Sequence, residues 1–299
     1  MRRRWKLPDA EAQARAASLA DEHNASSAFT ATLVSHGIET SGEAAAFLTP
    51  DRSKLHNPTG LPDMDAALAR IRAAVTARER VFVCGDYDVD GITSIVLVKR
   101  CLEAAGLEVG YYIPNRLVEG YGLSETGVRA AREWGAGLIV TVDSGITGHA
   151  EIALAGDLGI DVIVTDHHEI PPALPPAYAI VNPKLPDTDY PYRYMAGVGV
   201  ALRVAELLRA ELSRAAPDHA DRPWFGPRWI EEAFALAAIG SIAAIPAAFV
   251  ASVHGASSPC ISETLASSTG FPSVSRTLTS IRISRSSSPE VGGGVQYNR

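Results

Sequence analysis

The stretch that most constrains this chain is VFVCGDYDVDG, residues 81–91. Its β-branched, apolar beginning predicts a buried strand that ends at Gly85. Asp86, Asp88 and Asp90 then follow at every second position. Carboxylates this close together repel one another, so the cluster needs cations or strong hydrogen-bond donors to neutralise it. A divalent metal site is therefore the leading interpretation, and a solvated acidic turn is the alternative.

The size and composition of the chain leave several classes of protein open and exclude others. With 299 residues and 46% apolar composition, it can bury one large or two modest cores. A formal charge of −7 argues against nonspecific coating of nucleic acid, although a local basic groove stays compatible with it. The three cysteines lack metal-ligand spacing and are odd in number, which supports neither a zinc site nor a disulfide framework.

No apolar run reaches 18 residues, and the basic start of the chain is not followed by an apolar stretch. We therefore expect a cytoplasmic protein with no membrane partner.

The pattern of apolar residues divides the chain into three segments. Residues 1–80 predict a helical N-terminal extension, with helices over 12–19, 42–48 and 64–76. From residue 81 to 246, strands are predicted over 81–84, 109–113, 138–142, 162–165 and 179–181, and helices over 92–105, 124–134, 150–158, 198–212 and 229–239. Continuous apolar strands that alternate with amphipathic helices predict an α/β fold, a parallel sheet with helices on both faces.

The composition changes abruptly after Pro246. Residues 247–299 are rich in Ser, contain no Lys and show no sustained helical or strand period. We expect this tail to be disordered or never selected to fold, as a frameshift or a gene fragment would produce.

Polar side chains follow three of the predicted strands. The Asp86–Asp90 cluster follows the first, Asp143 follows residues 138–142, and Asp166, His167 and His168 follow residues 162–165. In a parallel sheet the carboxyl ends of the strands open on one edge, so these side chains are expected to converge. A single Asp after a strand is commonly a helix cap, but three coincident endings favour a Mn²⁺ or Mg²⁺ site.

Four motifs carry a resemblance to a known family: GDYDVDG at 85–91, IPNRLVEGYGL at 113–123, TVDSG at 141–145 and TDHH at 165–168. They resemble the DHH phosphoesterase superfamily and, more narrowly, its bacterial exonucleases of single-stranded DNA. The resemblance extends from about residue 4 to about residue 243. It implies a metal-dependent enzyme that removes nucleotides from the 5′ end of a single strand.

The resemblance also implies a role for each residue of the cluster. Four residues are expected to bind one or two Mn²⁺ or Mg²⁺ ions, with Asp143 as the bridge: Asp88, Asp90, Asp143 and His167. His168 is expected beside the scissile phosphate, and Asp86 as a supporting catalytic residue or a weaker ligand. A bound ion acidifies water and so supplies a nucleophile for in-line attack on phosphorus.

Five further residues are expected to contact the substrate. Asn115 and Arg116 are expected to bind a phosphate, and Tyr121 is expected to stack on a base. The alternatives are that Arg116 is an exposed surface residue and that Tyr121 packs in the core. Gly197 and Gly199 are expected to let a helix start approach a phosphate, on the weaker evidence of a lone GxG. Single-stranded DNA is the expected partner, with a single-strand-binding protein or a helicase implied by the resemblance.

The chain departs from the family at Ala244, where the motif LA-x-IG-T-V-AD has a further metal-ligating Asp. The family's clamp domains are also not recognisable after this point. We therefore expect weak or no exonuclease activity from this chain. The alternatives are a phosphodiesterase of short oligonucleotides or cyclic dinucleotides, a pyrophosphatase, or a non-catalytic binding scaffold.

Overall fold

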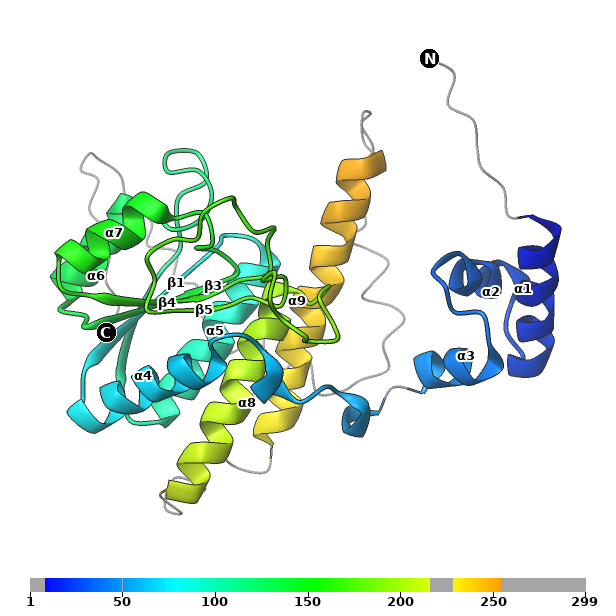
Figure 1. Cartoon of the computed structure of the whole chain (residues 1–299), viewed down its shortest axis with the longest axis horizontal. Coiled ribbons are helices and arrows are strands. Elements are labelled where there is room, and N and C mark those ends of the chain that lie inside the picture. The colour runs from blue at the N-terminus through cyan, green and yellow to red at the C-terminus, as the bar shows by residue number, and fades with distance from the viewer. Residues whose placement is uncertain (1–8, 50, 216–227, 254–299) are drawn as a thin grey trace, which may run out of the picture. The chain divides into compact units, whose positions relative to one another are not determined.

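The computed structural model describes residues 9–49, 51–215 and 228–253, and gives the backbone alone from residue 245 onward (Figure 1). The chain divides into two compact units, 1–248 and 249–299. Of the second unit, only residues 249–253 are described, and they form the end of a helix. The expected disorder of the tail therefore lies largely outside the described residues.

Three short helices near the N-terminus share a small core of their own. They are α1 (Ala10–His23), α2 (Ser27–Ser35) and α3 (Ser41–Leu48), each begun by a side chain that accepts a backbone hydrogen bond. Their buried residues are Ala16, Leu19, Leu33, Val34 and Ala44. The sequence analysis missed α2, because its Thr, Ser and Val residues are poor helix formers and only the Ser26 cap marks its start. Two 3₁₀ turns follow, η1 (Arg52–Lys54) and η2 (Pro58–Gly60).

The main body is built on a five-stranded sheet in the order β2-β1-β3-β4-β5, with every neighbouring pair parallel. The strands are β1 (Arg80–Gly85), β2 (Glu108–Tyr112), β3 (Leu138–Val142), β4 (Asp161–Thr165) and β5 (Ala179–Val181). Each lies within a residue or two of its predicted bounds. The predicted α/β fold with a parallel sheet is confirmed.

Helices cover both faces of this sheet (Figure 1). One face packs on α4 (Met64–Ala77), α5 (Val89–Ala104), α8 (Gly197–Ala215) and α9 (Trp229–Val253). The other packs on α6 (Glu125–Trp134) and α7 (His149–Asp157). Along β1 the buried side chains alternate accordingly, with Val81 and Val83 in the first core and Phe82 and Cys84 in the second. Both faces are thus buried, as the continuous apolar strands require.

Three details differ from the sequence analysis. Helix α5 begins at Val89 rather than at residue 92, because Asp88 caps it by accepting a hydrogen bond from the Gly91 N–H (2.9 Å). Helix α4, assigned to the N-terminal extension, buries Met64 and Ile71 in the core beneath the sheet. Helix α9 runs past residue 247, where the tail was expected to begin, and ends at Val253. The boundaries of the three segments stay a prediction.

Within the described ranges, none of the helices combines the length and the apolar character that a membrane crossing needs.

Candidate metal centre

The register of the sheet aligns the ends of four strands. Gly85 pairs with Val142, Val142 with Thr165, and Thr165 with Val181. The residues that directly follow these four therefore form a row along the carboxyl edge of the sheet: Asp86, Asp143, Asp166 and Asn182. The strand order reverses between β1 and β3, and in open α/β sheets ligands bind at such a switch point. Asp86 and Asp143 flank it.

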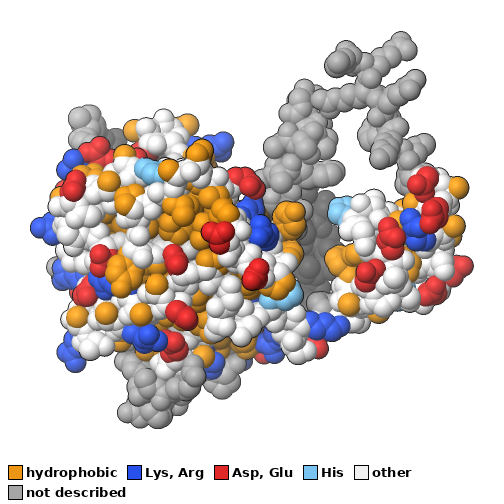
Figure 2. All heavy atoms as spheres, viewed as in Figure 1, with side chains coloured by type: hydrophobic (Ala, Val, Ile, Leu, Met, Phe, Trp, Pro, Cys, Tyr) orange, Lys and Arg blue, Asp and Glu red, His pale blue; other side chains and the backbone are white. Residues whose placement is uncertain are grey.

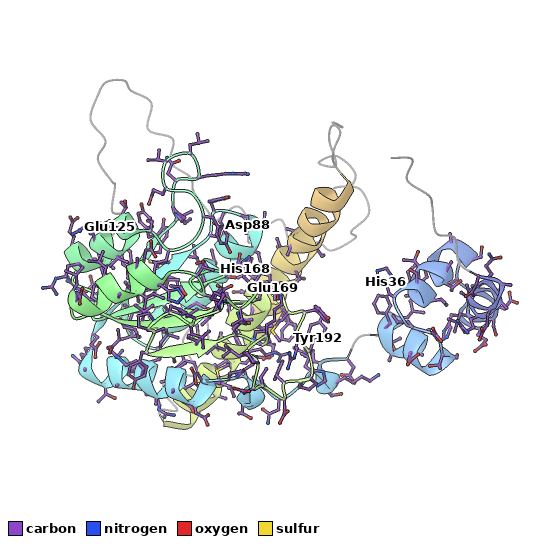
Figure 3. All side chains as sticks on the ribbon, turned by 45° about the horizontal axis from the view of Figure 1, so that its top comes forward. His36, Asp88, Glu125, His168, Glu169 and Tyr192 are labelled. Atoms are coloured by element: carbon purple, nitrogen blue, oxygen red, sulfur yellow. The ribbon has the colours of Figure 1, made fainter. Side chains whose placement is uncertain are left out.

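The predicted ligands converge at this edge. His167 Nε2 lies 3.0 Å from Asp143 Oδ1 and 3.8 Å from Asp90 Oδ2. Two groups of ligand atoms each fit within 4.8 Å, one from Asp143, His167 and His168 and the other from Asp86, Asp88 and Asp143. Asp143 belongs to both groups, which is the position expected of a residue that bridges two ions. Figure 3 shows Asp88 and His168 at the same end of the sheet.

The electrostatics of the cluster fit a cation. Asp86 Oδ1 and Asp143 Oδ1 are buried, and neither accepts a hydrogen bond from the described residues. His167 Nε2 lies 3.0 Å from Asp143 Oδ1, but this approach does not have the geometry of a hydrogen bond. Burial, together with the charges of Asp90 and Asp88, raises the pKa of Asp143 to about 9. Burial also raises the pKa values of Asp86 and Asp90. Buried carboxylates left without donors are costly unless a cation compensates them, so these residues suit a divalent ion with oxygen and imidazole ligands.

Asp143 has an unusual backbone. Its φ of 54° lies in the left-handed region, which costs energy for a residue other than glycine. Tyr121 Oη lies 3.2 Å from the Asp143 carbonyl oxygen and donates to it. A strained residue that carries a buried carboxylate at a switch point is typical of a functional site.

Asp90 differs from the other carboxylates because backbone donors already hold it. The Gly197 N–H donates to Oδ2 (2.8 Å) and the Val198 N–H donates to Oδ1 (2.7 Å). The first turn of α8 thus stabilises this carboxylate, through its free N–H groups and its helix dipole. The Gly197 N–H is therefore already used by Asp90, and the approach of Gly197 to a phosphate stays a prediction. A Cβ at Gly199 would meet the side chain of Met195, and a phosphate contact at Gly199 stays a prediction as well.

Asp166 is a central residue that the sequence analysis left without a role. It is 1% exposed and accepts hydrogen bonds from the N–H groups of Ile146, His167 and His168 and from His168 Nδ1 (2.7 Å). Burial opposes its charge, but the hydrogen bond and the charge of His168 outweigh burial and lower its pKa. Asp166 therefore fixes both histidines. Its place directly after a strand, as for Asp143, was the signal.

His168 and Tyr121 contact each other beside the carboxylates of the cluster. The Tyr121 hydroxyl lies 2.8 Å from His168 Nε2, and the two rings meet edge to face with centroids 5.3 Å apart. Burial opposes the charged imidazolium, but Asp166 outweighs it and raises the pKa of His168. Burial also raises the pKa of Tyr121 above its ordinary value, so its hydroxyl keeps its proton. Tyr121 thus belongs to the site rather than to the core, with about half of its surface exposed.

Asn115 and Arg116 lie in the loop after β2, and both are exposed. The Asn115 side chain is used within the loop, where it accepts a hydrogen bond from the Leu117 N–H (3.0 Å). Asn115 therefore shapes the loop in this structure, and a contact with phosphate stays a prediction for both residues.

Ala244 lies on α9, four residues after Gly240. A Cβ at Gly240 would lie 2.5 Å from Thr93 Oγ1 and 3.2 Å from Asp90 Oδ1, so this helix passes directly beside the cluster. Residues four apart share a face of a helix, which places position 244 on the side that faces Asp90.

Comparisons with known proteins agree with this arrangement. The DHH family, N-terminal domain, matches residues 80–224. The single-stranded-DNA-specific exonuclease RecJ of Bacillus subtilis is 38% identical over 242 residues, which are 80% of this chain and 28% of that protein. RecJ of Salmonella typhimurium is 42% identical over 189 residues, 61% of this chain and 32% of the relative. The chain thus spans about a third or less of these relatives.

Solved structures lead to the same family. An exonuclease RecJ bound to manganese shares 36% identity and a TM-score of 0.51, covering 62% of this chain and 44% of that one. RecJ of Thermus thermophilus in complex with Mn²⁺ shares 28% identity and a TM-score of 0.55, covering 81% and 31%. Because the match over residues 80–224 includes the strands and loops that carry the carboxylate and histidine cluster, this segment of the chain matches the N-terminal domain of the DHH family.

Proposed function

We propose that this chain is a metal-dependent phosphodiesterase domain that acts on single-stranded DNA from its 5′ end. The observation that carries the proposal is the shared position of Asp143, whose buried carboxylate lies in both groups of ligand atoms. A shared carboxylate suits two divalent ions, and two-ion sites are typical of nucleases and phosphatases. The names and bound metals of the RecJ relatives support the choice of DNA and of Mn²⁺ or Mg²⁺.

The residues take distinct roles in this proposal. Asp88, Asp143 and His167 would hold the ions. Asp90 would contribute from the first turn of α5, where the N–H groups at the start of α8 hold its carboxylate. Asp86 directly follows β1 and belongs to the same group of ligand atoms as Asp88 and Asp143. It would support these two ligands with its buried Oδ1. Divalent ions supply charge neutralisation for the phosphate and acidify a bound water. The protein's own part is to fix these ligands on strand ends, where rigid backbone holds them in register.

His168 would lie next to the scissile phosphate, and its ring also offers a ligand atom to one of the two groups. Its Nδ1–H is held by Asp166, and its raised pKa favours the imidazolium form. In this structure Nε2 contacts the Tyr121 hydroxyl (2.8 Å), so an imidazolium would exchange that contact for a charge-assisted hydrogen bond to a phosphate oxygen. Tyr121, which donates to the Asp143 carbonyl oxygen, orients this ring from its other side.

Ala244 limits the activity that we expect. An alanine offers no donor atom, so an ion that would use a carboxylate there loses one ligand and one compensating charge. Loss of a supporting residue alone costs about 10- to 100-fold in metal affinity or activity, and loss of a ligand costs at least as much. Acidic and basic side chains are interspersed over the visible face of the main body, so this face presents a mixed charge to DNA (Figure 2).

The test compares this chain with Ala244→Asp, using Mn²⁺ and a 5′-phosphorylated single strand. We expect weak cleavage by the unmodified chain and at least about 10-fold faster cleavage by Ala244→Asp, most clearly when it is fused to a complete RecJ C-terminal half. Asp143→Asn is the inactive control. Processive degradation by the unmodified chain would overturn the expected weakness. A fused Ala244→Asp protein that binds Mn²⁺ but stays inert would overturn the proposed activity.

The same assay separates the alternatives. Hydrolysis that slows as the oligonucleotide lengthens favours a phosphodiesterase of short oligonucleotides or cyclic dinucleotides, and release of phosphate from pyrophosphate favours a pyrophosphatase. Failure to bind Mn²⁺ in a calorimetric titration favours a non-catalytic scaffold. A role in DNA repair or recombination, partner proteins and a cytoplasmic location stay predictions.

A further inference from the structure

Arg116 has an unexpected partner. It lies close enough to Asp86 for its charge to act on that carboxyl, yet among the described residues it forms no salt bridge. Its guanidinium carbon instead lies 5.2 Å from the centroid of the Tyr87 ring. That distance is within the range of a cation–π interaction. The positive charge of Arg116 therefore lies against an aromatic ring, although the Asp86 carboxylate is within range of that charge.

The loop that carries Arg116 is fixed at its base. Glu119 Oε1 accepts a hydrogen bond from the Asn115 N–H (2.8 Å), and Glu119 Oε2 accepts from the hydroxyls of Tyr112 (2.7 Å) and Ser124 (2.6 Å). The tip points into solvent, where Leu117 is 94% exposed. Glu119 thus sets where the loop leaves the sheet, and the Arg116 side chain contacts the Tyr87 ring beyond this fixed base.

Tyr87 is itself placed by the metal cluster. It stands between Asp86, which is buried, and Asp88, which caps α5. Both neighbours belong to one group of ligand atoms, so the backbone on each side of the ring is fixed. The half-buried ring therefore extends from backbone that is fixed on both sides.

We propose that Tyr87 is a positioning residue that holds the Arg116 guanidinium by its face and presents the N–H groups to a phosphate of the bound strand. A cation–π contact does not require the five N–H donors of a guanidinium as hydrogen-bond partners, whereas an ion pair with an aspartate would use some of them. The phosphate part of this inference rests on the proposed function. The placement of Arg116 by Tyr87 does not.

A bound metal makes the ring more important. The carboxylates attract Arg116 to this edge while they are uncompensated, but divalent ions would reverse the local charge and repel it. The attraction between the ring and the guanidinium persists through that change. Tyr87 would therefore keep Arg116 in place in the metal-loaded protein, which is the state that meets the substrate.

The first experiment measures the mobility of Arg116 by NMR relaxation of its Nε–Hε group, assigned with Arg116→Lys. We compare the original protein with Tyr87→Phe, which keeps the ring, and Tyr87→Leu, which removes it. Tyr178→Leu is the matched control, because this exposed tyrosine precedes β5 at the opposite edge of the sheet. We expect an ordered Nε–Hε group in the original protein, Tyr87→Phe and Tyr178→Leu, and an order parameter below about 0.6 in Tyr87→Leu alone.

Unchanged order in Tyr87→Leu would overturn the inference, and so would equal loss of order in Tyr87→Phe. Mn²⁺ affinity is measured for each variant, so that a distorted Asp86–Asp88 turn is recognised by a loss of metal binding. Loss of Arg116 order together with unchanged Mn²⁺ affinity supports the inference.

The second experiment measures binding of a 5′-phosphorylated oligothymidine by fluorescence anisotropy with Mn²⁺, before any cleavage is detected. We expect Tyr87→Leu to bind about 2- to 10-fold more weakly and Tyr87→Phe to bind normally. In an Arg116→Ala background, Tyr87→Leu should cause no further loss. If the original protein binds no single strand, the proposed function fails while the NMR result still decides the placement of Arg116. If it binds and Tyr87→Leu binds equally well, the inference fails and the proposed function stands.

Discussion

Gly197 and Asp90 lie 107 residues apart in the sequence, yet the Gly197 N–H donates a 2.8 Å hydrogen bond to Asp90 Oδ2. The same glycine lies so close to Asp143 that a Cβ on it would stand 2.4 Å from Asp143 Oδ1. The start of α8 is therefore fitted against two carboxylates of the cluster at once. This close approach is possible only because residue 197 has no side chain.

The first prediction concerns this approach. Gly197→Ala should push α8 away from Asp143 and lower the free energy of unfolding by about 1–3 kcal/mol, the usual cost of overpacking. It should also weaken Mn²⁺ binding by at least about 10-fold, because Asp90 and Asp143 lose their arrangement. Urea unfolding and calorimetric Mn²⁺ titration measure the two effects. The matched control is Gly156→Ala on α7, where a Cβ meets nothing within 4 Å, and it should be neutral or stabilising by up to about 1 kcal/mol. Equal behaviour of the two variants would contradict the prediction.

The second prediction concerns pH. The pKa of Asp143 is about 9 in the metal-free folded protein against an ordinary value of 3.8, so the folded state holds a proton that the unfolded state releases. Stability then falls as pH rises from about 4 to about 9. In EDTA, urea unfolding at pH 6 and at pH 9 should show this loss, and Asp143→Asn should reduce it, because the amide carries no charge. A variant with the same pH dependence as the original protein would show that other groups cause the loss.

The third prediction concerns the amino ends of the strands, at the end of the sheet opposite to the carboxylate cluster. Arg70, on α4, has a side chain that is 10% exposed and forms salt bridges with Glu79 (2.7 Å) and Asp161 (2.6 Å) at the amino ends of β1 and β4. Arg70→Met should lower the free energy of unfolding by about 1–3 kcal/mol, because it leaves partly buried acceptors without their donor. Arg129→Met, which removes an exposed pair with Glu125 on α6, should cost at most about 0.5 kcal/mol. Similar losses in both variants, measured by urea unfolding, would argue against a special role for Arg70.

The fourth prediction concerns the thiols. Cys84 and Cys101 are buried, and burial raises the pKa of each to about 12. Both thiols are therefore neutral and shielded, and only the thiolate reacts readily. In a Cys260→Ser variant, a thiol reagent such as DTNB should label neither cysteine in native buffer and both in 6 M guanidinium. Rapid labelling of either in native buffer would show that the core opens at that place.

The sequence alone determined the type and approximate place of most of the main body's elements. Apolar runs and turn residues are local signals, and they located β3 and β5 to the residue. The sequence also determined which acids and histidines follow the strands, because a polar residue directly after an apolar run is visible without a fold. Where the local signal was weak, as in α2, the element was missed.

Tertiary structure decided how those residues meet. The register that aligns Asp86, Asp143 and Asp166 depends on pairing between strands that are distant in the sequence, and no local pattern contains it. The capture of Asp90 by α8 depends on where that helix packs, which the whole core determines. The sequence therefore determined which side chains could serve as metal ligands. Long-range packing decided which of them keep a free oxygen for a metal and which are already held by backbone N–H groups.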